Sequence, residues 1–304
     1  MTTIRGASHA GSWYKADPKV LGVQLDMWMD DAERGDRTAQ SNSKHPAIRA
    51  VIVPHAGYSY SGRTAGYSYA KLRSIAPSVK RAYVLGPSHH VYSKSCMLTL
   101  ADSLETPLGN LRVDRGEVER LLKLEGFTKW NSISEDEDEH SVEMQLPFIQ
   151  RVFGDNPQFS VVPITVGSIN LSQEAKVGKV LAECLANPEN ILIISSDFCH
   201  WGSRFRYQFR LDTSSPIHKS IESLDRQGMQ LIEAKDHKGF SEYLSTYRNT
   251  ICGRHPIGIL LGTIASLGDR DRYSVQFIHY EQSSQCLSMD DSSVSYAAAV
   301  VTVT

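Results

Sequence analysis

Short apolar runs alternate along this chain with longer stretches in which apolar residues recur every three or four positions. Apolar runs that end in Pro, Gly or Ser are typical of buried strands, and the longer spacing is typical of amphipathic helices. The pattern predicts strands at residues 50–54, 81–86, 159–166, 190–195, 273–280 and 296–303. It predicts helices at residues 18–31, 62–75, 172–186, 217–234 and 257–267, the third beginning at Ser172.

Strands that alternate with helices indicate an α/β fold, with a central, mostly β core flanked by helices. No internal repeat, low-complexity linker or shift in composition marks a boundary, so we expect a single domain over residues 1–304. The polar stretch at residues 32–44 is predicted to be a surface insertion before the first long strand.

Composition and charge argue against a nucleic-acid-binding protein and against a membrane-spanning protein. The 32 Lys and Arg residues are balanced by 34 Asp and Glu residues, whereas proteins that neutralise nucleic-acid phosphates carry a basic excess. The longest apolar stretch, residues 257–267, is well short of the ~20 residues that a membrane-spanning helix needs. The 5 cysteines form no CxxC pair, which favours reduced thiols in the cytoplasm or nucleus.

Three predicted strands run directly into residues that can bind a metal. The three strand-end segments are residues 54–58 with His55, residues 86–90 with His89 and His90, and residues 195–201 with Asp197 and His200. Ligands of open α/β sheets bind beyond the carboxyl ends of the strands, so these segments are expected to converge. A lone strand-end His is more often a hydrogen-bonded structural residue, but three such segments together favour a functional site.

A fourth candidate is Cys252, just before a predicted apolar helix. Pro256 suits the first helical position, so Cys252 would lie outside the helix N-terminus. The helix dipole and the neighbouring Arg254 would then favour the thiolate over the thiol. The alternative is an inert buried thiol.

An acidic run at residues 135–139 is expected to be a solvated loop. It continues into His140 and Glu143, which share one face if this segment is helical. The pair would then either line a pocket or make only a local contact on the helix surface.

Long motifs follow one another along nearly the whole chain, at residues 7–14 (ASHAGSWY), 54–58 (PHAGY), 86–90 (GPSHH), 136–143 (DEDEHSVE), 195–202 (SSDFCHWG), 249–258 (NTICGRHPIG) and 291–298 (DSSVSYAA). In these motifs the chain resembles the Memo family, mediators of receptor-tyrosine-kinase-driven cell motility. Proteins of that family are similar in fold to class III, LigB-type extradiol dioxygenases. The resemblance therefore implies a single α/β sandwich with a metal centre at the dioxygenase-like site.

The resemblance implies that His55, His89 and Cys252 are the metal ligands. It also implies that Asp197 and His200 line the same pocket, with His200 as the counterpart of the acid/base His of LigB-type enzymes. Non-haem Fe(II) oxygenases use two His and one carboxylate, whereas the third ligand here would be a softer, oxidisable thiolate. This difference argues against ring cleavage. The ligand set suits Fe(II) first, then copper, and Zn(II) less well.

Three functions follow as hypotheses. In the first, the protein is a metal-dependent redox protein of cell signalling, growth and motility, in which His200 moves protons and Asp197 orients it or a water molecule. In the second, it is an adaptor whose vestigial pocket binds a phosphotyrosine-type peptide or signalling protein through Arg254 or His90. The third, a zinc hydrolase, ranks last because the resemblance gives it no support.

Overall fold

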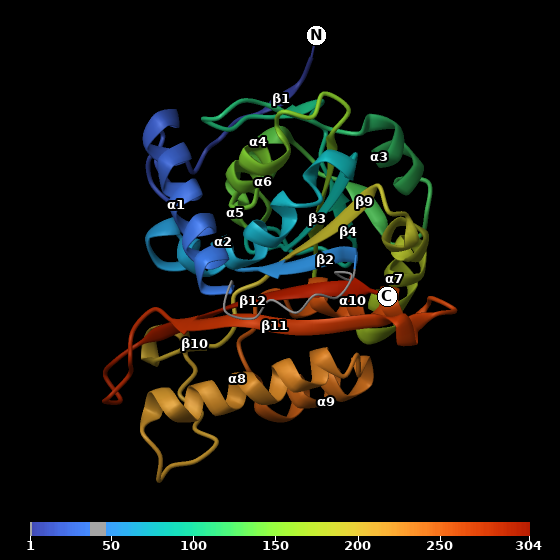
Figure 1. Ribbon diagram of the computed structural model, residues 1–304. Coiled ribbons are helices and arrows are strands. Elements are labelled where there is room, and N and C mark those ends of the chain that lie inside the picture. Colours follow the sequence, from blue (N-terminus) through green and yellow to red (C-terminus); the bar gives the residue numbers. More distant parts are fainter. Residues whose placement is uncertain (1, 37–46) are drawn as a thin grey trace.

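The computed structural model describes residues 2–36 and 47–304 (Figure 1). Its main sheet has the strand order β10-β12-β2-β9-β3-β8-β4-β7, and β11 pairs with β12. The strands are β2 (Ala47–Val53), β3 (Arg81–Pro87), β4 (Cys96–Leu98), β7 (Phe127–Lys129), β8 (Ser160–Val166), β9 (Asn190–Ser195), β10 (His200–Trp201), β11 (Tyr273–Gln282) and β12 (Ser293–Val303). A small second sheet joins β1 (Ile4–Arg5), β5 (Ser103–Leu104) and β6 (Leu111–Arg112).

The centre of the main sheet is parallel: β2 pairs with β9, β9 with β3 and β3 with β8, all in the same direction. Every residue of β8 and β9 is buried. Parallel strands covered on both faces read as continuous apolar runs, which is why the pattern of the sequence located them so well. Because these strands are parallel, the segments that follow β2, β3 and β9 leave the sheet at one common edge.

Helices cover both faces of the sheet. They are α1 (Pro18–Asp36), α2 (Tyr58–Arg73), α3 (Arg115–Leu121), α4 (Ile133–Asp138), α5 (His140–Glu143), α6 (Leu146–Phe153), α7 (Leu171–Ala186), α8 (Ile217–Glu233), α9 (His237–Tyr247) and α10 (Arg254–Ala265). Helix α2 packs on β2 and β12 and against α1 and α6, whereas α7 and α10 pack on each other and on β9. In Figure 1, α8 and α9 lie beyond the β11–β12 hairpin, on the side opposite to α2. One continuous cluster of buried apolar side chains joins these layers.

The α/β class is confirmed, and every predicted strand and helix is present, with ends that differ by five residues or fewer. The expectation of a surface insertion is wrong for residues 32–36, because they continue α1. The rest of that stretch, residues 37–44, lies outside the described residues. The prediction missed α9 because only Phe240 and Tyr243 of its 11 residues are buried, which leaves a weak apolar pattern. No helix in the described ranges is long and apolar enough to cross a membrane.

Two predicted helix starts are corrected. Helix α7 begins at Leu171 rather than Ser172, because the Asn170 side chain accepts a hydrogen bond from the backbone N–H of Gln173 and the Gln173 side-chain oxygen accepts one from the backbone N–H of Asn170. Helix α10 begins at Arg254, so Pro256 is its third residue rather than its first. Cys252 still lies just outside the helix, beside the N-cap residue Gly253.

Candidate metal centre

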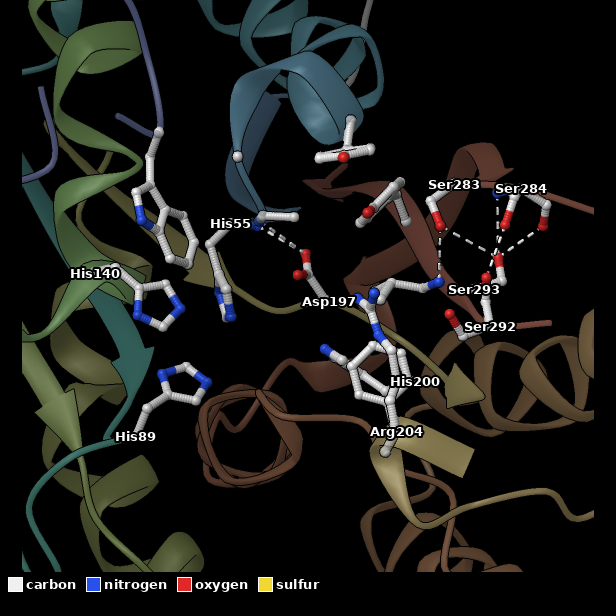
Figure 2. A pocket seen from close by; sticks show the side chains of 17 residues that line it. His55, His89, His140, Asp197, His200, Arg204, Ser283, Ser284, Ser292 and Ser293 are labelled. Atoms are coloured by element: carbon white, nitrogen blue, oxygen red, sulfur yellow. Dashed lines mark hydrogen bonds between the residues drawn. The ribbon is translucent and has the colours of Figure 1, made fainter. Parts of the chain in front are cut away.

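A cavity of about 530 Å³ opens at the common edge of the parallel strands. Four imidazoles and one carboxylate line it, those of His55, His89, His140, His200 and Asp197. Figure 2 shows His55, His89 and His140 gathered on one side of the cavity. The labelled serines lie on the other side, near His200 and Arg204. The cavity thus combines a nitrogen-rich wall with a rim of hydroxyl groups.

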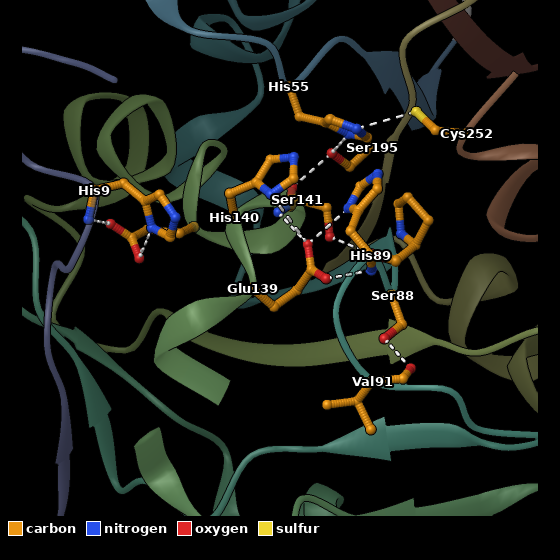
Figure 3. Close-up of polar contacts among 12 residues, drawn as sticks. His9, His55, Ser88, His89, Val91, Glu139, His140, Ser141, Ser195 and Cys252 are labelled. Carbon is orange, nitrogen blue, oxygen red and sulfur yellow. Dashed lines mark hydrogen bonds and ion pairs between the residues drawn. The ribbon is translucent and has the colours of Figure 1, made fainter. Parts of the chain in front are cut away.

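His55 directly follows β2, and its hydrogen bonds determine which ring nitrogen faces the cavity. Its Nδ1 lies 2.8 Å from the Ser195 hydroxyl, which itself donates to the Ser141 carbonyl at 2.7 Å and accepts from Gln145 at 2.9 Å. Since that hydroxyl has already used its proton, His55 Nδ1 must donate. Nε2 is therefore left with a free lone pair, 3.1 Å from the Cys252 sulfur (Figure 3). Burial and the neighbouring imidazoles hold the pKa of His55 well below its usual value, which favours this neutral form.

His89 is held in the same way by a buried carboxylate. Its Nδ1 lies 2.9 Å from one oxygen of Glu139, and its backbone N–H donates to the other oxygen at 2.5 Å. Burial raises the pKa of Glu139, but the hydrogen bonds and charge of His89 and His140 outweigh it and lower that pKa to about 2. An ionised Glu139 can only accept, so His89 donates from Nδ1 and its Nε2 is free to bind a ligand. A hydrogen bond donated by the ring nitrogen that faces away from the metal is characteristic of histidine metal ligands.

The structure brings the three residues implied to be ligands together. Potential ligand atoms of His55, His89 and Cys252 all lie within 4.8 Å of one another. Two imidazole nitrogens and a sulfur form a donor set that fits a soft or borderline transition metal. His89, Glu139 and His140 form a second close group, but the oxygens of Glu139 already accept hydrogen bonds from His89 and Ser141. The first group is therefore the candidate metal centre.

Of the two alternatives for Cys252, its surroundings favour the thiol over the thiolate. Burial raises the pKa of this thiol, the charge of Asp197 raises it further, and Arg254 opposes them only weakly. The sulfur lies 3.6 Å from the carbonyl of Asp197, as well as close to His55. A metal ion would replace the thiol proton on binding, since the thiolate is the form that binds metals.

Asp197 and His200 are both at the cavity, but they are not hydrogen-bonded to each other. Asp197 accepts from the backbone N–H groups of His55 at 2.8 Å and Ala56 at 3.3 Å, so it fixes the segment after β2. His200 Nδ1 instead lies 2.9 Å from the carbonyl of Phe198 and 3.1 Å from that of Thr250. The first half of the expectation for Asp197, that it orients His200, is therefore wrong, because backbone carbonyls do so. The other half, that it orients a water molecule, stays a prediction.

Residues 5–300 match the family model described as Memo-like protein. The chain belongs to the Memo-like family. It is 45% identical over 302 residues to Protein MEMO1 of Mus musculus, covering 98% of this chain and 97% of that protein. It is 44% identical to Protein MEMO1 of Homo sapiens, with the same coverage, and 41% identical to Protein memo-1 homolog of Caenorhabditis elegans, of which it covers 83%.

Among solved structures, an uncharacterized protein from Escherichia coli K12 matches with a TM-score of 0.47 and 15% sequence identity. The match covers 82% of this chain and 99% of the other. The assignment to the Memo-like family does not depend on it. The likeness in fold to LigB-type enzymes stays a prediction.

Three residues expected at the pocket of this Memo-like chain lie elsewhere. Glu143 is fully buried, accepts from Arg5 at 2.8 Å and from the Tyr14 hydroxyl at 2.9 Å, and does not reach the cavity. His90 is exposed and outside the lining, and Arg254 lines a different cavity. Of the expected pair at residues 140 and 143, only His140 lines the pocket, because the two side chains of this short helix face different neighbours.

The acidic run at residues 135–139 differs from the solvated loop that was expected. Residues 133–138 form α4 rather than a solvated loop, and Asp136 is buried against Arg5, with Nε 3.0 Å from Oδ1. Glu139 is 1% exposed and holds His89. No local signal could have identified Glu139, because its partner His89 lies 50 residues away in the sequence.

Proposed function

We propose that this Memo-like protein holds one redox-active metal ion, Fe(II) in preference to copper, between His55, His89 and Cys252. The proposal gives it a redox or metal-handling role in cell signalling, growth and motility, in the cytoplasm and also the nucleus, with residues 1–304 acting as one domain. One observation carries the metal assignment. Each imidazole bonds outward through Nδ1, which leaves a free Nε2 in a group that also contains a thiol.

The residues around this group have separate roles in the proposed chemistry. A bound iron or copper ion would supply one-electron chemistry. His200 would hold or move a proton at Nε2, because carbonyls of Phe198 and Thr250 engage its Nδ1. Asp197 keeps His55 in place through the backbone. A thiolate in place of the usual carboxylate ligand argues against ring cleavage. Zinc, the metal of the hydrolase hypothesis, can bind His and Cys ligands but would supply no redox chemistry.

The first test is to count Fe, Cu and Zn per chain in protein purified without oxygen or chelator. We expect near-stoichiometric iron or copper in the wild type and a loss of at least about tenfold in Cys252→Ser, because the soft ligand is gone. Cys184→Ser is the matched control, since Cys184 lies on α7 away from the cavity and should leave the metal content unchanged. A wild-type protein that refuses added metal, or equal metal content in Cys252→Ser, would contradict the proposal.

An adaptor function is the second candidate, and Arg204 favours it. This exposed guanidinium lies 4.4 Å from the centre of the Phe205 ring, lines the cavity and makes no hydrogen bond or ion pair within the described part of the chain. Serine hydroxyls share the same rim, those of Ser283, Ser284, Ser292 and Ser293. Arginine and hydroxyl donors together suit a phosphate group, such as that of a phosphotyrosine peptide.

This candidate predicts phosphopeptide binding that survives removal of the metal and weakens with added salt. Arg204→Gln should weaken binding about tenfold or more, whereas Arg206→Gln should not, because Arg206 is exposed and lies outside this cavity. Titration of the phosphorylated and unphosphorylated forms of one peptide makes the measurement. Equal affinity for both forms would exclude the adaptor function.

A further inference from the structure

A second cavity of about 630 Å³ lies where the N-terminal ends of α7 and α10 meet α9. One part of its lining is apolar, with Ile169, Leu171, Phe240 and Leu244. The other part carries charged and titratable groups, those of Glu174, His237, Arg248, Arg254 and His255. A cavity of this size, with an apolar wall and a few converging polar groups, is typical of small-molecule sites.

Glu174 organises the polar part of this cavity. It is only 7% exposed, and its two oxygens lie 2.7 Å from His237 Nε2 and 2.7 Å from His255 Nδ1. Although burial raises the pKa of Glu174, the hydrogen bonds from both imidazoles outweigh it and lower that pKa. The carboxylate therefore accepts from both rings and fixes their orientation. The other nitrogen of each ring has no partner among the described residues.

A glycine in α10 makes room for this arrangement. A Cβ at Gly258 would lie 2.2 Å from Glu174 Oε2, so no other residue fits opposite the carboxylate without a shift. Glycine in a helix interior costs about 1 kcal/mol relative to alanine. The fold thus tolerates a weaker helix at the position that lets Glu174 reach both imidazoles.

The charge of the cavity is left positive. Arg248 and Arg254 are exposed, and neither guanidinium makes a hydrogen bond or an ion pair within residues 2–36 and 47–304. The one carboxylate in the lining, Glu174, is already engaged by two imidazoles. Two free guanidinium groups oppose a cation in this cavity and favour an anion, above all one that can accept several hydrogen bonds.

We propose that this second cavity binds a small organic phosphate monoester, with the phosphate on Arg248 and Arg254 and the apolar body against Phe240 and Leu244. The phosphate then lies beside the unpartnered nitrogens of His237 and His255, which donate to it only when the rings carry a proton on both nitrogens. Glu174 is a positioning residue that aims both rings. The assignment is independent of the metal centre, because the two cavities share none of their lining residues.

Phenyl phosphate is a suitable probe, because it joins a dianionic head to an apolar ring. We expect full-length wild-type protein to bind it in calorimetry, and the Arg248→Gln/Arg254→Gln double variant to bind at least about tenfold more weakly. Arg206→Gln is the matched control, because Arg206 is exposed and lines neither cavity, and it should bind as the wild type does. Benzoate should bind more weakly than phenyl phosphate, since it carries one charge fewer.

Imidazole ¹⁵N resonances of the wild-type protein give an independent measurement that needs no variant. Phenyl phosphate should shift His237 and His255 while leaving His55 and His89 unchanged. No binding at about 10 mM probe, undiminished binding in the Arg248→Gln/Arg254→Gln double variant, or shifts confined to His55 and His89 would each overturn the proposal. Benzoate that binds as tightly as phenyl phosphate would overturn the assignment of a phosphate.

Discussion

The two cavities of this protein surround the same side chain, histidine, with different partners. In the first, His55 and His89 each bond outward through Nδ1, to Ser195 and Glu139, and keep Nε2 free beside a thiol. In the second, His237 and His255 both donate to Glu174 in a lining that also holds two arginines. The first cavity therefore presents lone pairs that suit a metal cation, and the second presents positive charge that suits an anion.

This contrast shows that an imidazole takes its role from its partners rather than from its position at a strand end or helix start. The bond made by one ring nitrogen determines what the other can offer. The nearest charges then determine whether a cation or an anion is favoured. Both cavities therefore depend on the residues that bond to the imidazoles or support them. Substitutions of those residues test the comparison.

The largest expected effect is on the free energy of unfolding, after substitution of Glu143 near the first cavity. Glu143 binds Arg5 and His9, and the segment that it holds brings the Trp13 ring to within 4.5 Å of the His140 ring, centre to centre. Glu143→Gln should lower the free energy of unfolding by about 3–5 kcal/mol at neutral pH, because it leaves Arg5 short of a partner in the interior. Urea unfolding measures this loss, and Asp138→Asn, an exposed neighbour, should change little.

The same variant has a pH signature. Burial raises the pKa of Glu143, but His9 and Arg5 outweigh it and lower that pKa to about 2. A carboxyl with a lowered pKa stabilises the fold fully above its ordinary value of 4.5, and that contribution is lost as the pH falls toward about 2. The difference between wild type and Glu143→Gln should therefore shrink below pH 4.5. A difference that stays constant down to about pH 3 would show that the charge of Glu143 is not what stabilises the fold.

A second change tests how the first cavity orients a ligand. Ser195→Ala removes the acceptor for His55 Nδ1 and should lower metal affinity about 10- to 100-fold, because the ring loses its fixed tautomer. Competition with a chelator measures the affinity. Ser68→Ala is the control, since Ser68 is equally buried and bonds to the carbonyl of Ile52 without touching the cavity. Equal losses in both variants would mean that the effect is general destabilisation.

The smallest expected effect is in the second cavity. Gly258→Ala should cost about 1–3 kcal/mol, because the new methyl group collides with Glu174, although alanine favours helices. Gly22→Ala in α1 is the matched control: its nearest neighbour would be Leu108 at 3.8 Å, so it should stabilise the protein by about 0.5–1 kcal/mol. Thermal unfolding distinguishes the two. Stabilisation by both variants would show that the carboxylate can move aside without cost.

The local pattern of residues was enough to predict the α/β class, the central strands and the strand-end segments. These features repeat over a few positions, and the buried parallel strands made the apolar runs continuous. The motifs likewise identified the family, and the matches at residues 5–300 confirm it. The metal ligands that the resemblance implied lie close together in the structure, and their role stays a prediction.

Packing alone decided which polar side chains face each cavity. Periodicity could not show that Glu143 turns toward Arg5 while His140 turns into the pocket, because the neighbours of α5 come from distant parts of the chain. Nor could it show that Glu139 holds His89, or that Arg254 lines a separate cavity. Nor could it decide between thiol and thiolate at Cys252, because the cost of burying a charge depends on the whole surroundings and not on the residues adjacent in sequence.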